Sequence, residues 1–462
     1  MAAIERYDVV VLGCGEAGKF IAWTLAKEGK RAVVIERRYV GGSCPNIACL
    51  PSKNEVQSAK VAKYLQRSKE FGMVVADGWR VDMAEVYARK RKMVDGLIEM
   101  HRENFAKSGA ELLMGSGKFV GERRLEVALQ AGGTRVIEGE MVFLNMGSRA
   151  QRIETPGLAD AAPLTHVEAL DLEAVPEHLI VLGGGYVGLE LAQAMRRFGS
   201  RVTVLERSAR LLPREDEDVS EALLQLFRDE GIEVVMNAHV ERVEGRSGAR
   251  VKVWLAGGAV LEGSHLLAAT GRTPNTDGIG LDLAGVKTTA KGFVQVNDRL
   301  ETTAANVWAL GDCAGSPLFT HIAFDDFRIV RDNLHGAKRT TTGRLVPSCM
   351  FTDPELARVG LNESAAKQQG IACRTAKIPA VAVLRARTLG ETRGFLKVVV
   401  GATDDRILGF TAFIAEAGEL LPTVQLAMNG GVSYPVLREM IFTHPTISEA
   451  FVPLLSAIPK RA

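Results

Sequence analysis

Two stretches of the chain repeat each other: DVVVLGCGEAGKFIAWTLAKEGKRAVVIER, residues 8–37, and HLIVLGGGYVGLELAQAMRRFGSRVTVLER, residues 178–207. Each runs from an apolar strand pattern through a G-x-G-x-x-G turn into a helix pattern, and then into a second strand that ends in an acid. The repeat preserves three glycines and one acid at an offset of 170 residues: Gly13, Gly15, Gly18 and Glu36, then Gly183, Gly185, Gly188 and Glu206.

A glycine triplet alone is weak evidence, but the strand, turn, helix, strand and acid together are the context of a dinucleotide-binding fold. The first glycine permits the tight turn, the second lets a pyrophosphate approach the backbone, and the third lets the helix pack on the strand. The helix N-terminus offers free N–H groups to the phosphates, and the acid accepts hydrogen bonds from a ribose. The repeat therefore predicts two Rossmann-type domains and two dinucleotide cofactors.

Glu206 also indicates which nicotinamide cofactor binds. A carboxylate at the ribose 2′ position would repel a 2′-phosphate, which favours NAD(H) over NADP(H). Arg207 and Arg210 stand close enough in the sequence to leave NADP(H) open.

Composition excludes several other classes of protein. The 462 residues suffice for about three domains of roughly 150 residues, and 47% hydrophobic residues allow large cores. A net charge of +2 without a basic tract argues against a nucleic-acid partner. The N-terminus lacks the pattern of a secretory signal, and no apolar run approaches the roughly 18 residues that span a bilayer, so we expect a cytoplasmic protein without membrane contact.

The rest of the chain contains further predicted strand ends, and its sequence pattern changes near residue 346. MVFLNMGSRA ends near Ser148, LLAATGRTPN runs through Asn275, and VWALGDCAG places Asp312 just after an apolar strand. From about residue 346, runs such as FLKVVVGATDDRILGFTAF predict antiparallel strands mixed with amphipathic helices, hence an α+β domain.

The stretch GGSCPNIACLPSK, residues 41–53, carries two of the six cysteines, Cys44 and Cys49. A structural zinc site would need a second close pair of ligands, and the other cysteines are scattered, so no metal site is predicted. A second alternative is that both cysteines are buried thiols without a chemical role. Pro45 and Pro51 bracket the pair at the start of an expected helix, where the N-terminus lowers a thiol pKa and favours a reactive thiolate.

Taken in order, these motifs together with ATGRTPN and HPTISE resemble the flavin-dependent pyridine nucleotide–disulfide oxidoreductases, from about residue 6 to residue 455. That family includes dihydrolipoamide dehydrogenase, glutathione reductase and mercuric reductase. The resemblance implies an α/β protein with an FAD-binding domain (1–150 and 275–335), an NAD(P)-binding domain (151–274) and a C-terminal dimerisation domain (346–462).

The resemblance also implies site roles. Cys49 is the flavin-side thiolate and Cys44 the interchange thiol, while His444, oriented by Glu449, relays protons to the cysteines of the other subunit of a homodimer. Lys53 pairs with Glu190, and Tyr186 is a lid that moves when nicotinamide enters. Besides the repeat and Lys53, residues expected at the cofactors are Gly42, Ser43, Gly147, Ser148, Gly271, Arg272, Gly311 and Asp312.

Substrate identity is the least determined point. The first hypothesis is an NADH-linked enzyme of dihydrolipoamide dehydrogenase type. The second is a metal-ion or oxidant-response reductase similar to mercuric reductase, although mercuric reductases deliver metal through a C-terminal cysteine pair and no cysteine follows Cys373 here. A small-thiol disulfide reductase and a non-catalytic flavin-bound sensor are further alternatives, and the acid–base dyad argues against the sensor.

Overall fold

The computed structural model describes residues 3–76 and 78–461, and the chain forms two compact units. Unit 1 comprises Met1–Asn54, Ala84–Gln151 and Gly271–Arg344, and unit 2 comprises Glu55–Met83, Arg152–Thr270 and Leu345–Ala462. Each glycine fingerprint thus belongs to a unit of its own. The division into three functional domains stays a prediction, because unit 2 combines the second nucleotide-binding region with the C-terminal region.

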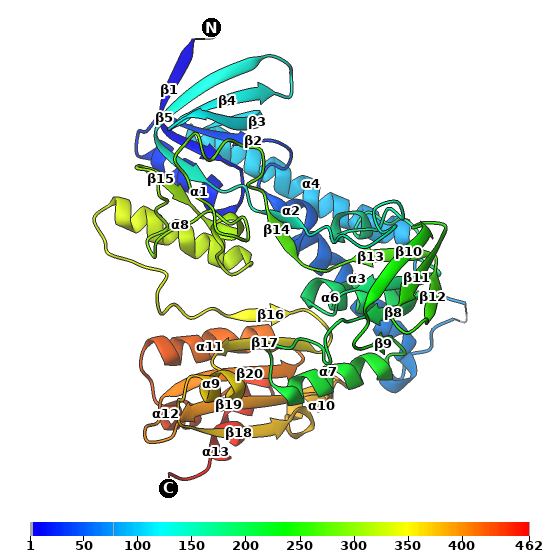
Figure 1. Cartoon of the computed structure of the whole chain (residues 1–462). Coiled ribbons are helices and arrows are strands. Elements are labelled where there is room, and N and C mark those ends of the chain that lie inside the picture. Colours follow the sequence, from blue (N-terminus) through cyan, green and yellow to red (C-terminus); the bar gives the residue numbers. More distant parts are fainter. Residues whose placement is uncertain (1–2, 77, 462) are drawn as a thin grey trace. The chain divides into compact units, whose positions relative to one another are not determined.

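Unit 1 is built on one large sheet (Figure 1). Its strands are β1 (Ile4–Leu12), β2 (Ala32–Glu36), β3 (Glu111–Gly121), β4 (Arg124–Leu129), β5 (Thr134–Leu144) and β15 (Val307–Ala309). β2, β1, β5 and β15 run parallel, and the first residues of β3 pair in parallel with β2. β4 pairs antiparallel with the second half of β3 and with the first half of β5. Every residue of β2 is buried, as expected of a strand covered on both faces.

The helices of unit 1 cover this sheet with apolar faces. They are α1 (Glu16–Lys27), α2 (Ser43–Ile47), the start of α3 (Cys49–Gln66), α4 (Met83–Ser108) and α8 (Thr320–Leu334), with the short η2 (Gly311–Ala314) after β15. α1 packs against β1, β2 and α8. Trp23 of α1 packs edge-on against Phe105 of α4, with the ring centroids 5.3 Å apart, so α1 sits between the sheet and two further helices.

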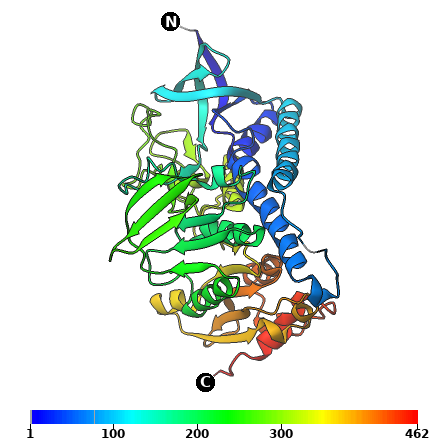
Figure 2. The same ribbon diagram turned by 90° about the vertical axis from the view of Figure 1, so that its right-hand side faces the viewer.

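The nucleotide-binding part of unit 2 repeats this plan on a smaller scale. Its parallel sheet has the order β13-β7-β8-β9, with β7 (His178–Leu182), β8 (Arg201–Leu205), β9 (Glu233–Val235) and β13 (His265–Ala268). α6 (Tyr186–Phe198) packs on β7 and β8, and α7 (Glu217–Asp229) on β9. An antiparallel sheet of β10 (Val240–Arg246), β11 (Arg250–Leu255) and β12 (Val260–Gly263), green in Figure 2, completes it.

The C-terminal part of unit 2 is the α+β fold that the sequence predicts. Five antiparallel strands have the order β16-β17-β20-β19-β18, namely β16 (Ser348–Met350), β17 (Glu355–Gly360), β18 (Cys373–Pro379), β19 (Phe395–Gly401) and β20 (Ile407–Ile414). α11 (Ala417–Asn429) packs on β17 and β20, and α13 (Phe451–Ser456) on β18 and β19. The chain between residues 401 and 407 forms the predicted hairpin.

Buried charges join the two parts of unit 2. Arg197 of α6 is 3% exposed, and its guanidinium lies 2.7 Å from Glu230 and 2.8 Å from Asp353 in the segment after β16. Gln193, one turn earlier, accepts a hydrogen bond from the Asp353 N–H at 2.8 Å. Removing one member of such a network leaves an uncompensated buried charge, at a cost of about 3–5 kcal/mol. The network therefore fixes α6 against the C-terminal part.

Among the helices of the described residues, none is both long and apolar enough to cross a membrane.

Candidate redox and cofactor site

The first fingerprint forms a closed turn between β1 and α1. Gly13 has a φ of +100°, and a Cβ there would lie 2.4 Å from the carbonyl oxygen of Asn145. A Cβ on Gly18 would lie 2.5 Å from the carbonyl oxygen of Gly13. Gly15 is the N-cap of α1 and has no side chain to cap the helix. The N-terminus of a helix at such a turn favours an anion through its backbone N–H groups and its dipole.

Glu36, the acid at the end of the motif, holds this turn together. One carboxylate oxygen accepts a hydrogen bond from the Cys14 N–H at 2.8 Å, and the other accepts from Arg38 N–H at 2.7 Å and Tyr39 N–H at 2.9 Å. Because an ionised carboxylate has about four acceptor positions, Glu36 retains capacity for a ribose hydroxyl.

Asn145, which sequence reasoning missed, ties the first fingerprint to the rest of unit 1. The side-chain oxygen accepts from the Gly18 N–H at 2.9 Å, and the side-chain nitrogen donates to the Leu310 carbonyl at 2.8 Å. The same oxygen lies where a Cβ on Gly15 would come within 2.4 Å. The signal available in the sequence was an asparagine directly after the apolar run MVFL, at the end of a predicted strand.

The second fingerprint shares the turn but not the enclosure. Gly183 has a φ of +105°, and a Cβ there would lie 2.5 Å from the carbonyl oxygen of Ala269. Glu206 makes the same kind of hydrogen bonds as Glu36. Its carboxylate accepts from the Gly184 N–H at 2.8 Å and from the Ser208 N–H at 2.7 Å. Gly188 packs on Gly183 as Gly18 packs on Gly13, with a Cβ clash at 2.2 Å.

Gly185 differs from its counterpart Gly15. It is exposed, and a Cβ at this position would meet nothing within 4 Å. α6 begins there without a side-chain cap, and Tyr186, its first residue, forms a hydrogen bond with Ser348. Burial raises the pKa of the Tyr186 phenol to about 12, so it is a neutral side chain beside an open helix N-terminus.

The loop that carries the cysteines passes over the first fingerprint. Gly42 has a φ of +82°, and a Cβ there would lie 2.6 Å from the Gly15 Cα. The Asn46 side chain donates to the carbonyls of Val40 at 2.9 Å and Gly42 at 2.7 Å, which fixes the loop from within. Ser43 begins α2, so the predicted Gly42 and Ser43 positions lie beside the first cofactor turn.

Cys44 lies on α2, and Cys49 is the first residue of α3. Both are free thiols in this structure, and they contact each other through a hydrogen bond. The hydrogen bond to Cys49, and then burial, raise the pKa of Cys44 well above its usual range. The lowered pKa expected from a helix N-terminus is therefore wrong for Cys44, because the neighbouring sulfur and the buried position outweigh the helix.

Thr320, the first residue of α8, is a further contact of the sulfur pair. Its hydroxyl lies 3.3 Å from the Cys49 Sγ. Sequence reasoning did not single out this residue. Only the fold brings a position 271 residues away to the cysteine pair.

Three of the predicted cofactor residues form one cluster after β15. The Ser148 hydroxyl donates to the Asp312 carboxylate, and Arg272 Nε donates to the Ser148 hydroxyl at 2.7 Å. Arg272 also lies 3.8 Å from Asp312. Gly311 adopts a φ of +70°, with its N–H donating at 2.8 Å to the buried Asp326, which sequence reasoning did not single out. The remaining predicted glycines also have positive φ, Gly147 at +66° and Gly271 at +130°.

His444 and Glu449 form the predicted dyad. The His444 Nδ1 lies 2.9 Å from the Glu449 carboxylate, whose other oxygen accepts the Thr446 N–H at 2.9 Å. The hydrogen bond from His444, followed by that from Thr446, lowers the pKa of Glu449. Nδ1 is therefore the donor, and Nε2 is left to accept a proton. The imidazole is 64% exposed on this chain.

Lys53 and Glu190 belong to different units, so their predicted pairing stays a prediction. Lys53 lies on α3, one turn beyond Cys49. Glu190 is buried on α6 and accepts a hydrogen bond from the Phe351 N–H at 2.8 Å.

Cys14 and Cys313 are fully buried, and burial raises the pKa of each to about 12, which disfavours the thiolate form of both. In the described part of the chain, no group of three or more His, Cys, Asp or Glu side chains is placed to hold a metal ion.

Comparison with known families agrees with this arrangement. Residues 7–326 match the pyridine nucleotide-disulphide oxidoreductase family, and residues 346–455 match the dimerisation domain of the same family. The chain therefore belongs to the flavoprotein pyridine nucleotide–disulfide oxidoreductases.

Individual relatives fall into three groups. The chain is 36% identical to the probable pyridine nucleotide-disulfide oxidoreductase RclA of Escherichia coli, over 98% of this chain and 100% of that protein. It is 34% identical to mercuric reductase of Streptomyces lividans (97% and 96%) and 31% identical to dihydrolipoyl dehydrogenase of Chlamydia muridarum (97% and 96%). The solved structure of the HOCl-induced flavoprotein disulfide reductase RclA superposes with a TM-score of 0.89, covering 97% of this chain and 99% of that one.

The first fingerprint fits the flavin nucleotide that this family carries. Gly15, which lacks a Cβ, lets the Asn145 side chain approach the start of α1. The N-terminus of the helix after the glycine turn is where a pyrophosphate binds in this fold. Glu36 would hold the ribose, and Asp312 lies among hydroxyl and guanidinium donors suited to a polyol chain. The family and the predicted fold class are confirmed, while the role of each residue stays a prediction.

Proposed function

We propose that this protein uses NADH to reduce a small disulfide at the Cys44–Cys49 pair. The observation that carries the proposal is the contact between the two sulfurs in a loop that lies directly on the first fingerprint. When bound, FAD supplies the two-electron link between the nicotinamide and the sulfur pair.

The protein's own residues account for the thiol chemistry. The Cys44 thiolate attacks one sulfur of a substrate R–S–S–R, forms a mixed disulfide and releases one thiolate. The Cys49 thiolate then attacks the Cys44 sulfur, which restores the Cys44–Cys49 bond and releases the second thiolate. Two electrons from NADH reopen the bond, and the two thiolates take up two protons.

Cys44 needs a base for this reaction. Its raised pKa means that the thiol keeps its proton at neutral pH unless an acceptor removes it. His444 of the second subunit of a dimer, with Nε2 free to accept because Nδ1 donates to Glu449, is the proposed acceptor, and it returns the proton to the departing thiolate.

A homodimer is part of the proposal. The family dimerisation domain covers residues 346–455. Ile441, three residues before His444, is fully exposed, and Met440 and Val436 are 49% and 58% exposed. Apolar side chains so exposed on one segment are typical of an interface, and such an interface would also give His444 a partner surface.

A metal-ion reductase is the second candidate. It is supported by the 34% identity to a mercuric reductase and by a solved structure of the relative RclA described as a Cu(II) complex. A dihydrolipoamide dehydrogenase, our first hypothesis from the sequence, is a disulfide reductase of the same chemistry, and the 31% identity to that enzyme keeps lipoamide among the substrates to test.

The test is anaerobic oxidation of NADH by the flavin-loaded dimer with lipoamide, with an uncharged small disulfide, or with mercuric ion in excess thiol, and with NADPH in parallel. We expect turnover with a disulfide, and Cys49→Ala should remove it while flavin absorbance per chain stays unchanged. Turnover with mercuric ion alone would instead assign the metal-ion function.

A further inference from the structure

A buried carboxylate on α8, Asp326, takes no part in the thiol chemistry and lies beside the turn that carries Asp312. Its side chain is fully buried. One carboxylate oxygen accepts hydrogen bonds from the Gly311 N–H at 2.8 Å and from the Ser316 hydroxyl at 2.7 Å. The other oxygen lies 2.6 Å from a guanidinium nitrogen of Arg344. The carboxylate therefore joins three segments of unit 1: α8, the turn after β15 and the stretch that follows α8.

Arg344 provides the countercharge for this carboxylate. The side chains of Asp326 and Arg344 are 0% and 14% exposed. Burial raises the pKa of Asp326, and the hydrogen bonds from Arg344, Ser316 and Gly311 oppose that shift. A hydrogen bond to an ionised acceptor is roughly twice as strong as one to a neutral acceptor. The ion pair therefore strengthens the hold of Asp326 on the Gly311 N–H.

The peptide group between Leu310 and Gly311 is held at both of its ends. Its N–H, which belongs to Gly311, donates to Asp326, and its carbonyl, which belongs to Leu310, accepts from the Asn145 side-chain nitrogen at 2.8 Å. The Asn145 side-chain oxygen accepts in turn from the Gly18 N–H at 2.9 Å. A continuous chain of hydrogen bonds therefore runs from the first fingerprint to the buried carboxylate.

All three hydrogen bonds of this chain point in one direction. Gly18 donates to Asn145, Asn145 donates to the Leu310 carbonyl, and the N–H of the same peptide group donates to the carboxylate of Asp326. Aligned hydrogen bonds in a buried, low-dielectric setting polarise and strengthen one another. The negative charge at the end of the chain therefore strengthens the contact at the fingerprint as well as the contact at Gly311.

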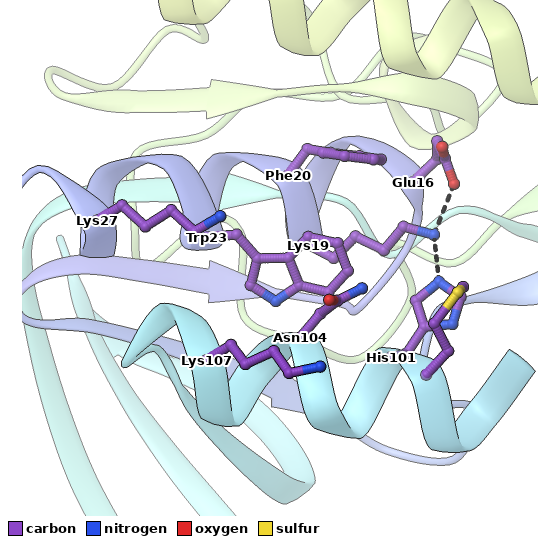
Figure 3. A pocket seen from close by; sticks show the side chains of 9 residues that line it. Glu16, Lys19, Phe20, Trp23, Lys27, His101, Asn104 and Lys107 are labelled. Atoms are coloured by element: carbon purple, nitrogen blue, oxygen red, sulfur yellow. Dashed lines mark hydrogen bonds and ion pairs between the residues drawn. The ribbon is translucent and has the colours of Figure 1, made fainter.

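The chain contacts α1 away from the cavity of about 470 Å³ that α1 forms with α4. Figure 3 shows Lys19 and Trp23 among the side chains that line this cavity. Gly18 instead faces the sheet, because a Cβ on it would lie 2.9 Å from the Val11 side chain and 3.1 Å from that of Asn145. Substitutions in the chain therefore leave the lining of the cavity unchanged.

We propose that Asp326 is a positioning residue for the flavin. Through the hydrogen-bond chain it fixes the turn that carries Asp312 and the start of α1, which are two of the places where the flavin is expected to bind. Arg344 supports it by balancing its charge. The proposal rests on the location of FAD in the proposed function and does not depend on which substrate is reduced, so flavin binding is the direct readout.

The experiment measures flavin per chain, the rate of flavin release on dilution, and the rise in the midpoint of thermal unfolding on addition of FAD. Asp326→Ala removes the acceptor of the Gly311 N–H. We expect flavin release to become about 10- to 100-fold faster and the rise in midpoint to shrink. Asp325→Ala is the matched control, because Asp325 is the preceding carboxylate on α8 and also lies 3.4 Å from Arg344. It should leave flavin release unchanged.

Two double variants separate the hydrogen bond from the charge. Both contain Arg344→Met, which removes the cation. Combined with Asp326→Asn, it leaves a side-chain oxygen to accept from the Gly311 N–H, and combined with Asp326→Ala it leaves none. We expect the variant with asparagine to release flavin about 3- to 10-fold more slowly than the variant with alanine, and to keep the visible flavin spectrum of the native protein.

Unchanged flavin release in Asp326→Ala, or equal release from the two double variants, would overturn the proposal. A lower midpoint without FAD but an unchanged flavin release rate would assign Asp326 a structural role only, which also overturns it. If alanine at this position prevents folding, Asp326→Asn alone decides the question, and release at the native rate would then refute the proposal. Native protein that retains its flavin but reduces no disulfide would refute the proposed function instead, while the flavin measurements still judge Asp326.

Discussion

The two glycine fingerprints have the same sequence pattern but differ in how tightly the protein encloses them. At the first, Asn145 and the cysteine loop crowd Gly15: a Cβ on Gly15 would lie 2.4 Å from Asn145 Oδ1, and a Cβ on Gly42 would lie 2.6 Å from the Gly15 Cα. At the second, Gly185 is exposed, and a Cβ on it would meet nothing within 4 Å.

We propose that this difference follows from the predicted assignment of FAD to the first fingerprint and of the nicotinamide cofactor to the second. A flavin that stays bound through many turnovers suits an enclosed turn, and a nicotinamide that enters and leaves in each cycle suits an open helix N-terminus. On this proposal, two turns with the same glycine pattern serve a resident and an exchangeable cofactor, and the neighbours of the middle glycine make the difference.

The strongest test of the comparison is the pair of substitutions Gly15→Ala and Gly185→Ala. Both residues have extended backbone that alanine adopts freely, so only the surroundings differ. Gly15→Ala must displace Asn145 or the cysteine loop, and we expect protein that purifies with almost no flavin. Gly185→Ala should keep its flavin and raise the KM for NADH. Flavin absorbance per chain and NADH kinetics measure both, and equal flavin loss in the two variants would contradict the comparison.

A substitution outside both fingerprints tests whether the thiol chemistry can be lost while both cofactor turns stay intact. His444→Gln removes the proposed base while leaving each turn untouched, and we expect disulfide turnover to fall by about 10²- to 10⁴-fold. Because the pKa of Cys44 is raised, the remaining activity should increase with pH across the neutral range as direct ionisation of that thiol increases. A variant whose activity stays independent of pH would argue against His444 as the base, and unchanged flavin content is the control.

Asn145→Ala sharpens the comparison because the second fingerprint has an alanine, Ala269, at the equivalent position, where its N–H bonds to Leu182 as that of Asn145 bonds to Leu12. The substitution leaves the Gly18 N–H and the Leu310 carbonyl without their partner, at about 1–3 kcal/mol for each buried group. We expect a lower midpoint of thermal unfolding and weaker flavin retention, with the KM for NADH changed little. Calorimetry and flavin release on dialysis measure these effects. A large rise in the KM for NADH with full flavin content would show that Asn145 supports nicotinamide binding and not flavin binding.

The smallest expected effect is at Glu206. Glu206→Gln keeps the shape and one acceptor oxygen but removes the charge that would repel a 2′-phosphate. We expect the ratio of kcat/KM for NADH to that for NADPH to fall by about 3- to 10-fold, equivalent to roughly 0.7–1.4 kcal/mol. Glu36→Gln is the matched control and should leave the ratio unchanged. A native enzyme that already prefers NADPH would refute the predicted preference.

Much of the fold was readable because its signals are local. The alternation of strand, glycine turn and helix defined both nucleotide-binding regions, and β19 and β20 lie in the run FLKVVVGATDDRILGFTAF, where antiparallel strands were predicted. The contact between His444 and Glu449 was also predictable, since the two lie five residues apart within one short segment.

Residues whose partners are distant in the sequence were not predictable in this way. Asn145 contacts a glycine 127 residues away, and Thr320 reaches Cys49 across 271 residues. The pKa of Cys44 was misjudged for a related reason. The local helix rule predicted a lowered pKa. The hydrogen bond to Cys49 and burial, which both depend on packing, raise it instead.

The sequence by itself determined the class of the protein, the two dinucleotide turns, the position of the cysteine pair and the order of the regions, because each depends on residues close together in the chain. Only the tertiary structure decided which turn is enclosed and which is open, and which side chains surround the sulfurs. These features depend on distances between distant segments, and such distances are set by how whole elements pack and not by the pattern within any one of them.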